Sequence, residues 1–451
     1  MAKSILIANR GEIALRVIRA AKANGLKTII VYSEADKNSL PVRLADSSVC
    51  IGPAAPNLSY LNQNSIISAA EMLGADLIHP GYGFLSENAE FVEKLESNGF
   101  VLVGPSCEAI KTMGDKVTAI KTMSKLGVPC VPGSNGILTD NKQEIIDIAD
   151  KIGYPVLIKA SGGGGGRGMR VVWQQSELIE AVQMTRSEAK SAFNNPDVYM
   201  EKFLERPRHI EIQVFGDGNG NAIHIGERDC SMQRKHQKVI EEAQAPGLSD
   251  EERNSIFKIC TEACKGLKYR GAGTFEFLYQ DGSFYFIEMN TRIQVEHPIS
   301  EQISQTDLVS EQIYVALNGK LSIKQSDIKF NGHSIECRIN AENPKTFIPS
   351  PGVINTLHVP GGPGVRFDSH IYQNYRIPHY YDSMIAKLIC TADTRAKAIN
   401  RMHQALNELV IDGVETNIAL HKKILSRQDF MDGNFSIHFV EKMLQQESSN
   451  E

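Results

Sequence analysis

Apolar runs alternate with amphipathic stretches along the first part of the chain. Residues 4–8 and 27–32 are short apolar runs, which predicts strands, and residues 12–23 between them have the periodicity of a helix. Residues 75–79 and 100–103 repeat the strand pattern. Apolar strands that alternate with helices are typical of a parallel sheet covered on both faces. This part is therefore predicted to be an α/β domain.

The loops after these strands are the expected ligand positions, because open α/β sheets bind ligands at the carboxyl ends of their strands. The first loop reads Ala8-Asn9-Arg10-Gly11-Glu12 and not Gly-x-Gly-x-x-Gly. A role in binding NAD is therefore disfavoured, although Glu34 and Asp36 end the second strand. The pattern favours a related fold without NAD.

A nearly pure glycine segment, residues 162–168, interrupts the middle of the chain. It follows a predicted strand at residues 156–160 that carries Lys159, and a returning strand is predicted at residues 171–173. Glycines expose backbone N–H groups and let the chain close over phosphates. No Gly-Lys-Ser/Thr follows, so the segment is not a Walker A loop. A flexible linker is the alternative, but a lid over a polyphosphate is favoured.

Strand and helix patterns continue to the end of the chain. Helices are predicted at residues 177–190 and 394–409, and strands at residues 198–204, 210–215, 334–340 and 384–390. The polar tail after Glu441 is expected to fray.

Asp281-Gly282 marks a turn between two strand-like runs, at residues 273–279 and 283–290, that carry Glu276 and Glu288. A two-residue loop pairs Glu276 with Ile287, whereas an odd-length loop such as residues 281–283 pairs it with Glu288. We predict the odd register, because buried like charges face to face need a cation such as Mg²⁺ between them. The alternative is two separately solvated glutamates.

Polar side chains alternate with apolar ones from residue 288 to residue 296. The polar set is Glu288, Asn290, Arg292, Gln294 and Glu296. In an extended segment these five side chains share one face. Two carboxylates, two amides and a guanidinium indicate a site for a divalent metal and a small oxyanion. The alternative is the solvent-facing side of a half-buried strand.

Several cationic side chains are candidate partners for phosphate or another anion: Lys116, Lys159, Lys202, His209, His236 and Lys238. Lys159 stands out because it ends an apolar strand beside the glycine segment. His236 and Lys238 belong to the basic cluster at residues 232–238, which could equally be an exposed turn.

Composition limits the class of protein. The 451 residues exceed one ordinary core, so about two to four domains are expected. A net charge of −5 gives no reason to expect nucleic acid or an anionic membrane as partner. The eight cysteines lack a Cys-x-x-Cys pair, and Cys260 and Cys264 are expected to be buried thiols. With no signal peptide or long apolar run, a cytoplasmic protein is predicted.

Taken together, these segments resemble the biotin carboxylase family of the ATP-grasp superfamily. The resemblance is carried by residues 8–14, 79–88, 159–169, 227–238, 288–298, 336–344 and 380–387, and it extends over essentially the whole chain. It implies an α/β and α+β fold with three parts: a Rossmann-like α/β domain (1–113), an ATP-grasp domain (114–330) with a glycine-loop lid at about 131–203, and a C-terminal domain (331–446) that completes the site.

The resemblance also implies an activity and a set of site residues. Bicarbonate would be activated by ATP as carboxyphosphate, and biotin then carboxylated at its ureido N1′. ATP would be held by Lys116, Lys159, Gly165, Gly166, Glu201, Lys202, Leu204, His209, Gln233, His236, Leu278 and Ile437. Two Mg²⁺ or Mn²⁺ ions would be held by Glu276, Glu288 and Asn290. Bicarbonate would be held by Lys238, Arg292, Gln294 and Val295. Glu296 would be its general base, Arg338 would face the ureido oxygen and Tyr82 would pocket the biotin ring. The residues expected to be catalytic are Lys238, Arg292, Glu296 and Arg338.

The chain contains no Ala-Met-Lys-Met biotin-attachment motif. It therefore resembles the free-standing subunit, which carboxylates a separate biotin carboxyl carrier protein and works with the carboxyltransferase subunits of acetyl-CoA carboxylase in fatty acid synthesis. A homodimer is expected from the family. The alternatives are a propionyl-CoA or pyruvate carboxylase subunit, another ATP-grasp ligase such as a carbamoyl phosphate synthetase half or a purine-pathway carboxylase, and a regulatory nucleotide-binding subunit without turnover.

Overall fold

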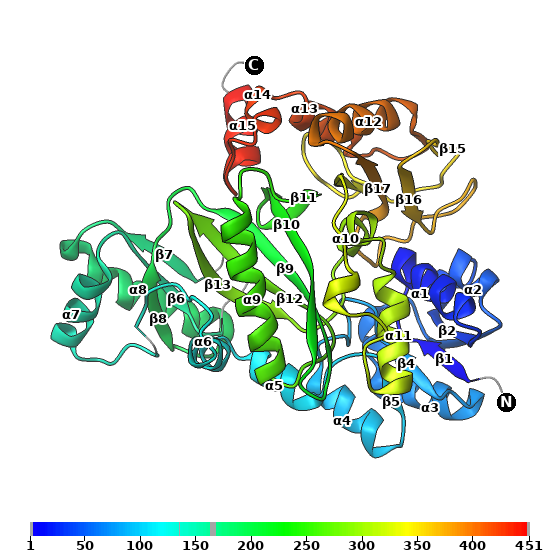
Figure 1. The fold of residues 1–451 in the computed structure, drawn as a ribbon, viewed down its shortest axis with the longest axis horizontal. Coiled ribbons are helices and arrows are strands. Elements are labelled where there is room, and N and C mark those ends of the chain that lie inside the picture. The colour runs from blue at the N-terminus through cyan, green and yellow to red at the C-terminus, as the bar shows by residue number, and fades with distance from the viewer. Residues whose placement is uncertain (1–2, 135, 163–167, 449–451) are drawn as a thin grey trace.

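The computed structural model describes residues 3–134, 136–162 and 168–448, and within them the strands form four sheets (Figure 1). The first sheet is parallel, with the order β3-β2-β1-β4-β5. Its strands are β1 (Ser4–Ile7), β2 (Lys27–Ser33), β3 (Ser47–Gly52), β4 (Leu77–His79) and β5 (Val101–Leu102). The predicted parallel α/β sheet is thus confirmed. The sequence pattern missed β3, because this edge strand is mostly exposed and lacks an apolar run.

Helices cover both faces of this sheet, and the first four of them connect its strands. They are α1 (Gly11–Ala23), α2 (Leu40–Leu44), α3 (Gln63–Leu73), α4 (Ala89–Ser97) and α5 (Cys107–Gly114). Two separate clusters of buried side chains show that both faces are covered. Ile5 and Ile7 of β1 pack with α1 on one side, whereas Leu6 packs with α3 and α4 on the other. The sheet is therefore buried on both faces, as its apolar strands predicted.

An eight-stranded antiparallel sheet forms the centre of the molecule, in the order β13-β12-β9-β10-β11-β14-β17-β16. Its strands are β9 (Arg208–Asp217), β10 (Ala222–Arg234), β11 (Gln237–Ala243), β12 (Arg270–Gln280), β13 (Ser283–Asn290), β14 (His333–Asn340), β16 (Val365–Ser369) and β17 (Met384–Ala392). Pairing between β11 and β14 joins residues on the two sides of the predicted boundary at residue 330. The last three strands therefore extend the sheet of the middle region.

A smaller unit lies at the left of Figure 1 and holds the glycine segment. It consists of β6 (Val156–Ala160), β7 (Met169–Val172), β8 (Val198–Lys202), α7 (Lys142–Ile152) and α8 (Gln175–Phe193). β6 and β7 are antiparallel neighbours, so the predicted strands on either side of the glycine segment are confirmed. Residues 163–167 lie outside the described residues, and with them Gly165 and Gly166.

Besides three short 3₁₀ helices (Glu34–Asp36, Pro56–Leu58 and Gln325–Asp327), the remaining elements are α6 (Lys116–Lys125), α9 (Asp250–Gly266), α10 (His297–Ser304), α11 (Leu308–Asn318), β15 (Thr356–His358), α12 (Arg395–Glu408), β18 (Val410–Asp412), α13 (Ile418–Leu425), α14 (Gln428–Met431) and α15 (Phe439–Ser448). The expectation that the tail frays after Glu441 was wrong as far as Ser448. Val440 and Met443 of α15 are buried in the C-terminal core, which holds this helix in place.

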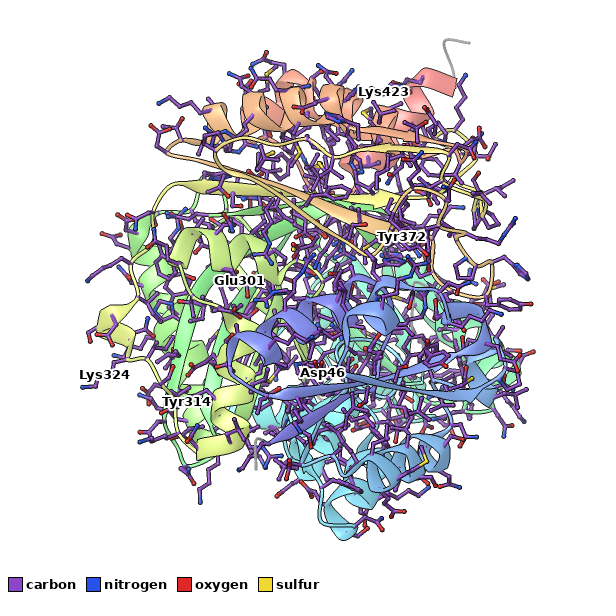
Figure 2. The ribbon with its side chains drawn as sticks, turned by 90° about the vertical axis from the view of Figure 1, so that its right-hand side faces the viewer. Asp46, Glu301, Tyr314, Lys324, Tyr372 and Lys423 are labelled. Carbon is purple, nitrogen blue, oxygen red and sulfur yellow. The ribbon has the colours of Figure 1, made fainter. Side chains whose placement is uncertain are left out.

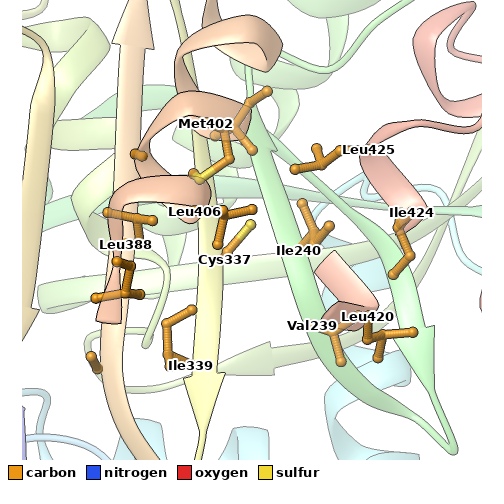
Figure 3. Close-up of a cluster of buried hydrophobic side chains, with 14 of the residues drawn as sticks. Val239, Ile240, Cys337, Ile339, Leu388, Met402, Leu406, Leu420, Ile424 and Leu425 are labelled. Atoms are coloured by element: carbon orange, nitrogen blue, oxygen red, sulfur yellow. The ribbon is translucent and has the colours of Figure 1, made fainter. Parts of the chain in front are cut away.

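One face of the strands β11, β14 and β17 is apolar and packs against α12 and α13 (Figure 3). Ile240, Cys337 and Leu388 come from the three strands, and Leu406 reaches them from α12. Because side chains alternate across a strand, the neighbouring positions point to the opposite face of the sheet. That opposite face carries the charged residues described below.

Ion pairs connect the N-terminal sheet to the rest of the molecule. Glu301 of α10, labelled in Figure 2, accepts hydrogen bonds from Arg16 (2.8 Å) and Arg366 (2.7 Å). Tyr372, also labelled, accepts a hydrogen bond from Arg43 at 2.7 Å. Among the described residues, no helix combines the length and the apolar character needed to cross a membrane.

Truncating Leu406 to alanine should destabilise the C-terminal core by about 2–5 kcal/mol, because this fully buried side chain fills space between α12 and the sheet. Urea unfolding followed by circular dichroism measures the change. Met72→Ala is the control, since Met72 is 66% exposed and should shift the curve little. Equal shifts in the two variants would contradict this account of the core.

Candidate functional site

A cleft of about 1000 Å³ opens where the N-terminal sheet, the central sheet and the smaller unit that carries β6, β7 and β8, the predicted lid, meet. The predicted site residues that line it are Tyr82, Lys116, Lys159, Glu201, Lys202, Leu204, His209, Gln233, His236, Lys238, Glu276, Leu278, Glu288, Asn290, Arg292, Gln294, Val295, Arg338 and Ile437. Glu296 is absent from the lining, since it is fully buried behind Lys238 and Arg338. Residues far apart in the sequence are thus brought to one cavity.

Glu276 and Glu288 are direct partners across β12 and β13, so the predicted pairing is confirmed. The predicted cause, an odd-length loop, was wrong. Gln280 pairs with Ser283, which leaves the two-residue loop Asp281-Gly282 with positive φ at both positions. Ile287 is an extra residue in β13, and this β-bulge shifts the register by one. The bulge therefore brings the two carboxylates face to face.

The sequence predicted that the polar run would stay extended as far as residue 296, and this prediction was wrong. β13 ends at Asn290, and an irregular segment leads to Glu296, the residue before α10. The amides converge nevertheless, since Asn290 Nδ2 and Gln294 Nε2 each donate to Glu276 Oε1 at 2.8 Å. Arg292 donates to Asn290 Oδ1 at 2.8 Å and to Gln294 Oε1 at 3.2 Å. Hydrogen bonds, rather than strand alternation, bring these side chains together.

Lys238 connects three buried carboxylates. Its Nζ donates to Glu211 at 2.7 Å, Glu276 at 2.9 Å and Glu296 at 2.7 Å. Both predictions for the basic cluster at residues 232–238, an exposed turn and an anion-binding group, thus apply to different members of it. Lys235 and His236 form the exposed turn of the β10–β11 hairpin, with positive φ at both, while Lys238 enters the site.

The pKa values of the two facing glutamates move in opposite directions. Burial raises the pKa of each, but Lys238 and His209 more than offset this for Glu276 and hold its pKa well below the usual range. Burial and the charge of Glu276 raise the pKa of Glu288. This arrangement of hard oxygen ligands suits Mg²⁺ or Mn²⁺, whose charge would remove the repulsion between the carboxylates.

Glu296 lies between two cations. Its Oε1 accepts from Lys238, and its Oε2 accepts from Arg338 Nη2 at 2.9 Å. Burial disfavours its charge, but Lys238 and Arg338 reverse that effect and place the pKa of Glu296 well below the usual range. Glu296 is therefore an ionised carboxylate at neutral pH, buried directly behind two cations that line the cleft. Arg338 Nε donates to a further buried carboxylate, Glu241.

The lid side of the cleft carries the other predicted cations. Lys159 forms an ion pair with Glu201 of β8, and Lys202 Nζ donates to the carbonyl oxygens of Gly153 (3.0 Å) and Tyr154 (2.8 Å). On the central sheet, His209 Nε2 lies 3.1 Å from Glu276 Oε2. His209 Nδ1 meets Gln233 Nε2 at 3.0 Å, so Nδ1 is the acceptor. The lid and sheet groups together surround space for a polyphosphate.

Sequence reasoning missed a buried network beneath the cleft. Glu12 of α1 accepts a hydrogen bond from the Tyr82 hydroxyl and forms an ion pair with Lys387 at 3.0 Å. Lys387, which has no solvent exposure, also donates to the carbonyl oxygen of Val295 at 2.8 Å. Glu12 belongs to the segment Ala8–Ala14, which carried the resemblance but received no role. Through Tyr82 and Lys387, Glu12 thus connects the predicted biotin position with the predicted bicarbonate position.

Two further carboxylates were also missed. Glu87 accepts from Arg292 Nε at 2.8 Å, and Glu211 forms a buried ion pair with Arg228. Arg228 in turn donates to Gln213 at 2.8 Å and Ser300 at 2.9 Å. Glu211 and Arg228 lie on neighbouring strands. The alternation of polar and apolar residues along these strands does not identify either of them as part of a site. Glu87 does belong to a segment of the resemblance, residues 79–88.

Three family descriptions match successive parts of the chain. They are "Biotin carboxylase, N-terminal domain" at residues 1–110, "Carbamoyl-phosphate synthase L chain, ATP binding domain" at residues 115–324 and "Biotin carboxylase C-terminal domain" at residues 336–442.

Known proteins match nearly the whole chain. A biotin carboxylase of Haemophilus influenzae is 60% identical over 98% of this chain and 99% of its own length. A pyruvate carboxylase subunit of Methanothermobacter thermautotrophicus is 53% identical over 98% of this chain and 90% of its own. The crystal structure of a Campylobacter jejuni biotin carboxylase–βγ-ATP complex has a TM-score of 0.92 at 51% identity, covering 98% and 99% of the two chains. A Hydrogenobacter thermophilus 2-oxoglutarate carboxylase biotin carboxylase domain dimer, with MgADP, ADP and bicarbonate, has a TM-score of 0.90 at 47% identity, covering 98% of each chain.

Replacing Lys387 by methionine should destabilise the protein by about 3–5 kcal/mol, because Glu12 then stays buried without a cation. Adding Glu12→Gln removes the stranded charge and should restore part of the loss. Urea unfolding of the two single variants and the double variant measures the coupling. Strictly additive effects would mean that Glu12 and Lys387 do not stabilise each other.

Proposed function

The chain belongs to the biotin carboxylase family of ATP-dependent ligases, and on that premise we propose how its residues share the carboxylation of biotin. The observation that carries the proposal is the ionised, fully buried Glu296 between Lys238 and Arg338. A carboxylate held directly behind the cations that line an anion-binding cleft can accept the proton of bicarbonate, which is a poor nucleophile until it loses that proton.

We assign the nucleotide to the lid side of the cleft and the metal to the two facing glutamates. Lys116, Lys159 and Lys202 line the cleft near His209, and their charge suits phosphate groups. Glu276 and Glu288 would hold Mg²⁺ or Mn²⁺, with Asn290 as a further oxygen ligand and two ions as the expected number. A metal ion held there would supply positive charge against the negative charge that develops on the phosphoryl oxygens. Gly165 and Gly166 remain predicted contacts of the nucleotide.

We assign bicarbonate to the space between Lys238, Arg292 and Gln294. Arg292 lines this space with a planar guanidinium whose charge suits a carboxylate-shaped anion, and Glu87 and Asn290 hold it in place. A bound anion would compete with Glu296 for the charge of Lys238. This competition raises the pKa of Glu296 toward the range in which a carboxylate is an effective general base.

We assign the biotin ring to the end of the cleft lined by Tyr82 and Arg338. In the proposed sequence, carboxyphosphate breaks to CO₂ and phosphate, phosphate takes the ureido N1′ proton, and N1′ then forms its new bond to the carbon of CO₂. The remaining Nη donors of Arg338 can then stabilise the enolate oxygen, as an oxyanion hole does. Tyr82 is held by Glu12, so the ring pocket depends on α1 as well as on its own loop.

We propose a separate biotin carboxyl carrier protein as the acceptor and the carboxyltransferase of acetyl-CoA carboxylase as the final partner, in the cytoplasm. The chain's similarity to a biotin carboxylase at 60% identity supports this choice, and its 53% identity to a pyruvate carboxylase subunit keeps the pyruvate system as the second candidate. A homodimer and the domain boundaries at residues 113 and 330 are part of the same proposal. Sedimentation of the purified protein tests the homodimer, because a monomer at micromolar concentration would contradict it.

Replacing Glu296 by glutamine should lower biotin-dependent ADP release by about 10²–10⁴-fold, because the amide cannot accept a proton. The assay combines ATP, Mg²⁺, bicarbonate and free biotin. Glu227→Gln is the matched control, since it also removes a buried carboxylate from the central sheet, but one that accepts from Arg253 at 2.7 Å outside the cleft. Unchanged biotin-dependent turnover in Glu296→Gln would falsify the assignment of the base.

The choice of carrier can be tested with purified acceptors. The chain should carboxylate the biotinylated carrier of the acetyl-CoA carboxylase from the same cell faster than it carboxylates the biotin domain of a pyruvate carboxylase. Carboxylation is followed by transfer of labelled bicarbonate to protein-bound biotin. A preference for the pyruvate carboxylase domain would reverse the proposed partner and leave the biotin carboxylase activity in place.

A further inference from the structure

Two buried glutamates face each other at the centre of the molecule, and the reaction proposed above uses neither. Glu241 of β11 and Glu336 of β14 are direct partners in the central sheet, and both side chains are fully buried. Cβ atoms of such partners lie about 4.5–5.5 Å apart. The same face carries Arg338, two residues beyond Glu336, and its β17 partner Lys387. The pair therefore lies directly behind the group assigned to biotin.

Three of the four oxygens in this pair have no hydrogen-bond partner within the described part of the chain. They are Glu241 Oε2 and both oxygens of Glu336, whereas Glu241 Oε1 accepts from Arg338 Nε. Two ionised carboxylates cannot bond to each other, because neither has a hydrogen to donate. A single proton between them supplies the missing donor and satisfies an oxygen on each side.

The surroundings favour such a proton. Ile389 is the β17 partner of Glu336, and it packs with Ile299 and Ile303 of α10 over this face. Burial raises the pKa of Glu336 well above the usual range, and the charge of Glu241 adds to the effect. Burial also raises the pKa of Glu241, to about 7. The charged and titratable groups around the pair are Lys238, Cys230, Cys337, Arg338, Lys387, Tyr82 and Glu296, with Glu12 paired to Lys387.

We propose that Glu241 and Glu336 share one proton at neutral pH and act as a positioning pair for Arg338. The inference rests on the proposed role of Arg338 toward biotin. With one proton the pair carries a single negative charge, and Arg338 bridges Glu241 Oε1 and Glu296 Oε2. Loss of the proton leaves two negative charges on the β11–β14 side of the guanidinium. That excess charge draws Arg338 away from Glu296 and from the biotin position.

The shared proton can be observed without the reaction. Infrared difference spectra of the wild-type protein between neutral and alkaline pH should contain the loss of a protonated carboxyl band. Glu336→Gln and Glu241→Gln should each remove that component, since the remaining carboxyl no longer faces a second carboxylate. A band that keeps its full intensity in both variants would overturn the proposal. This outcome is independent of whether Glu296 is the base.

The consequence for biotin is read from the pH dependence of kcat/KM for biotin. In the wild type this value should fall as rising pH removes the shared proton. In Glu336→Gln the side chain at position 336 is neutral at every pH. The fall in kcat/KM for biotin should therefore occur at a pH higher by about one unit or more. Glu242→Gln is the matched control, because Glu242 is a buried neighbour on β11 that pairs with His333 and Arg395, each at 2.7 Å.

The control should lose stability but keep the wild-type pH profile. An alkaline fall at the same pH in Glu336→Gln and the wild type would overturn the positioning role. If Glu336→Gln does not fold, the infrared comparison of the wild type with Glu241→Gln decides the question of the proton. A general loss of packing would lower activity at all pH values and would not move the profile.

Discussion

The site depends on one physical constraint, the balance of buried charge on one face of the central sheet. Lys238 holds three carboxylates within 2.9 Å, and Glu211 is also paired with Arg228. Each of these charges would be costly to bury alone, so no member can be removed without leaving another uncompensated. An anion or a metal ion that enters the cleft changes this balance directly. The same network that holds the side chains in place therefore also sets their pKa values.

Two irregularities in the strands make this balance possible. The extra residue Ile287 in β13 turns Glu288 toward Glu276, and a similar register shift at Val239 in β11 lets Lys238 and Glu241 serve the same face. In a regular strand, side chains separated by an odd number of sequence positions point to opposite faces. β-Bulges are a known means of re-aiming side chains beside functional sites. Here they concentrate charge that ordinary alternation would divide between the cleft and the core.

The site also belongs to no single region of the chain. Glu12 from helix α1, Val295 from the segment before α10 and Lys387 from the C-terminal strands meet in one hydrogen-bonded chain. Pairing of β11 with β14 makes the central sheet continuous across the predicted boundary at residue 330. A displacement of the N-terminal region or of the C-terminal strands would therefore shift the side chains at both the bicarbonate and the biotin positions. The positioning pair Glu241–Glu336 lies at this same junction.

The sequence by itself determined the parallel N-terminal sheet and the strands around the glycine segment, because local periodicity and turn residues depend on neighbours in the chain. Most of the residues that reach the cleft were implied by the resemblance of the sequence motifs to the biotin carboxylase family, and not by periodicity. It could not determine the bulge at Ile287, the end of β13 at Asn290 or the helical tail, since register and packing decide them. Glu12, Glu241, Glu336 and Lys387 had no role in the sequence, because each acts through a partner from a distant strand or helix. Only the tertiary structure brings such charges together, and their burial gives them their chemical properties.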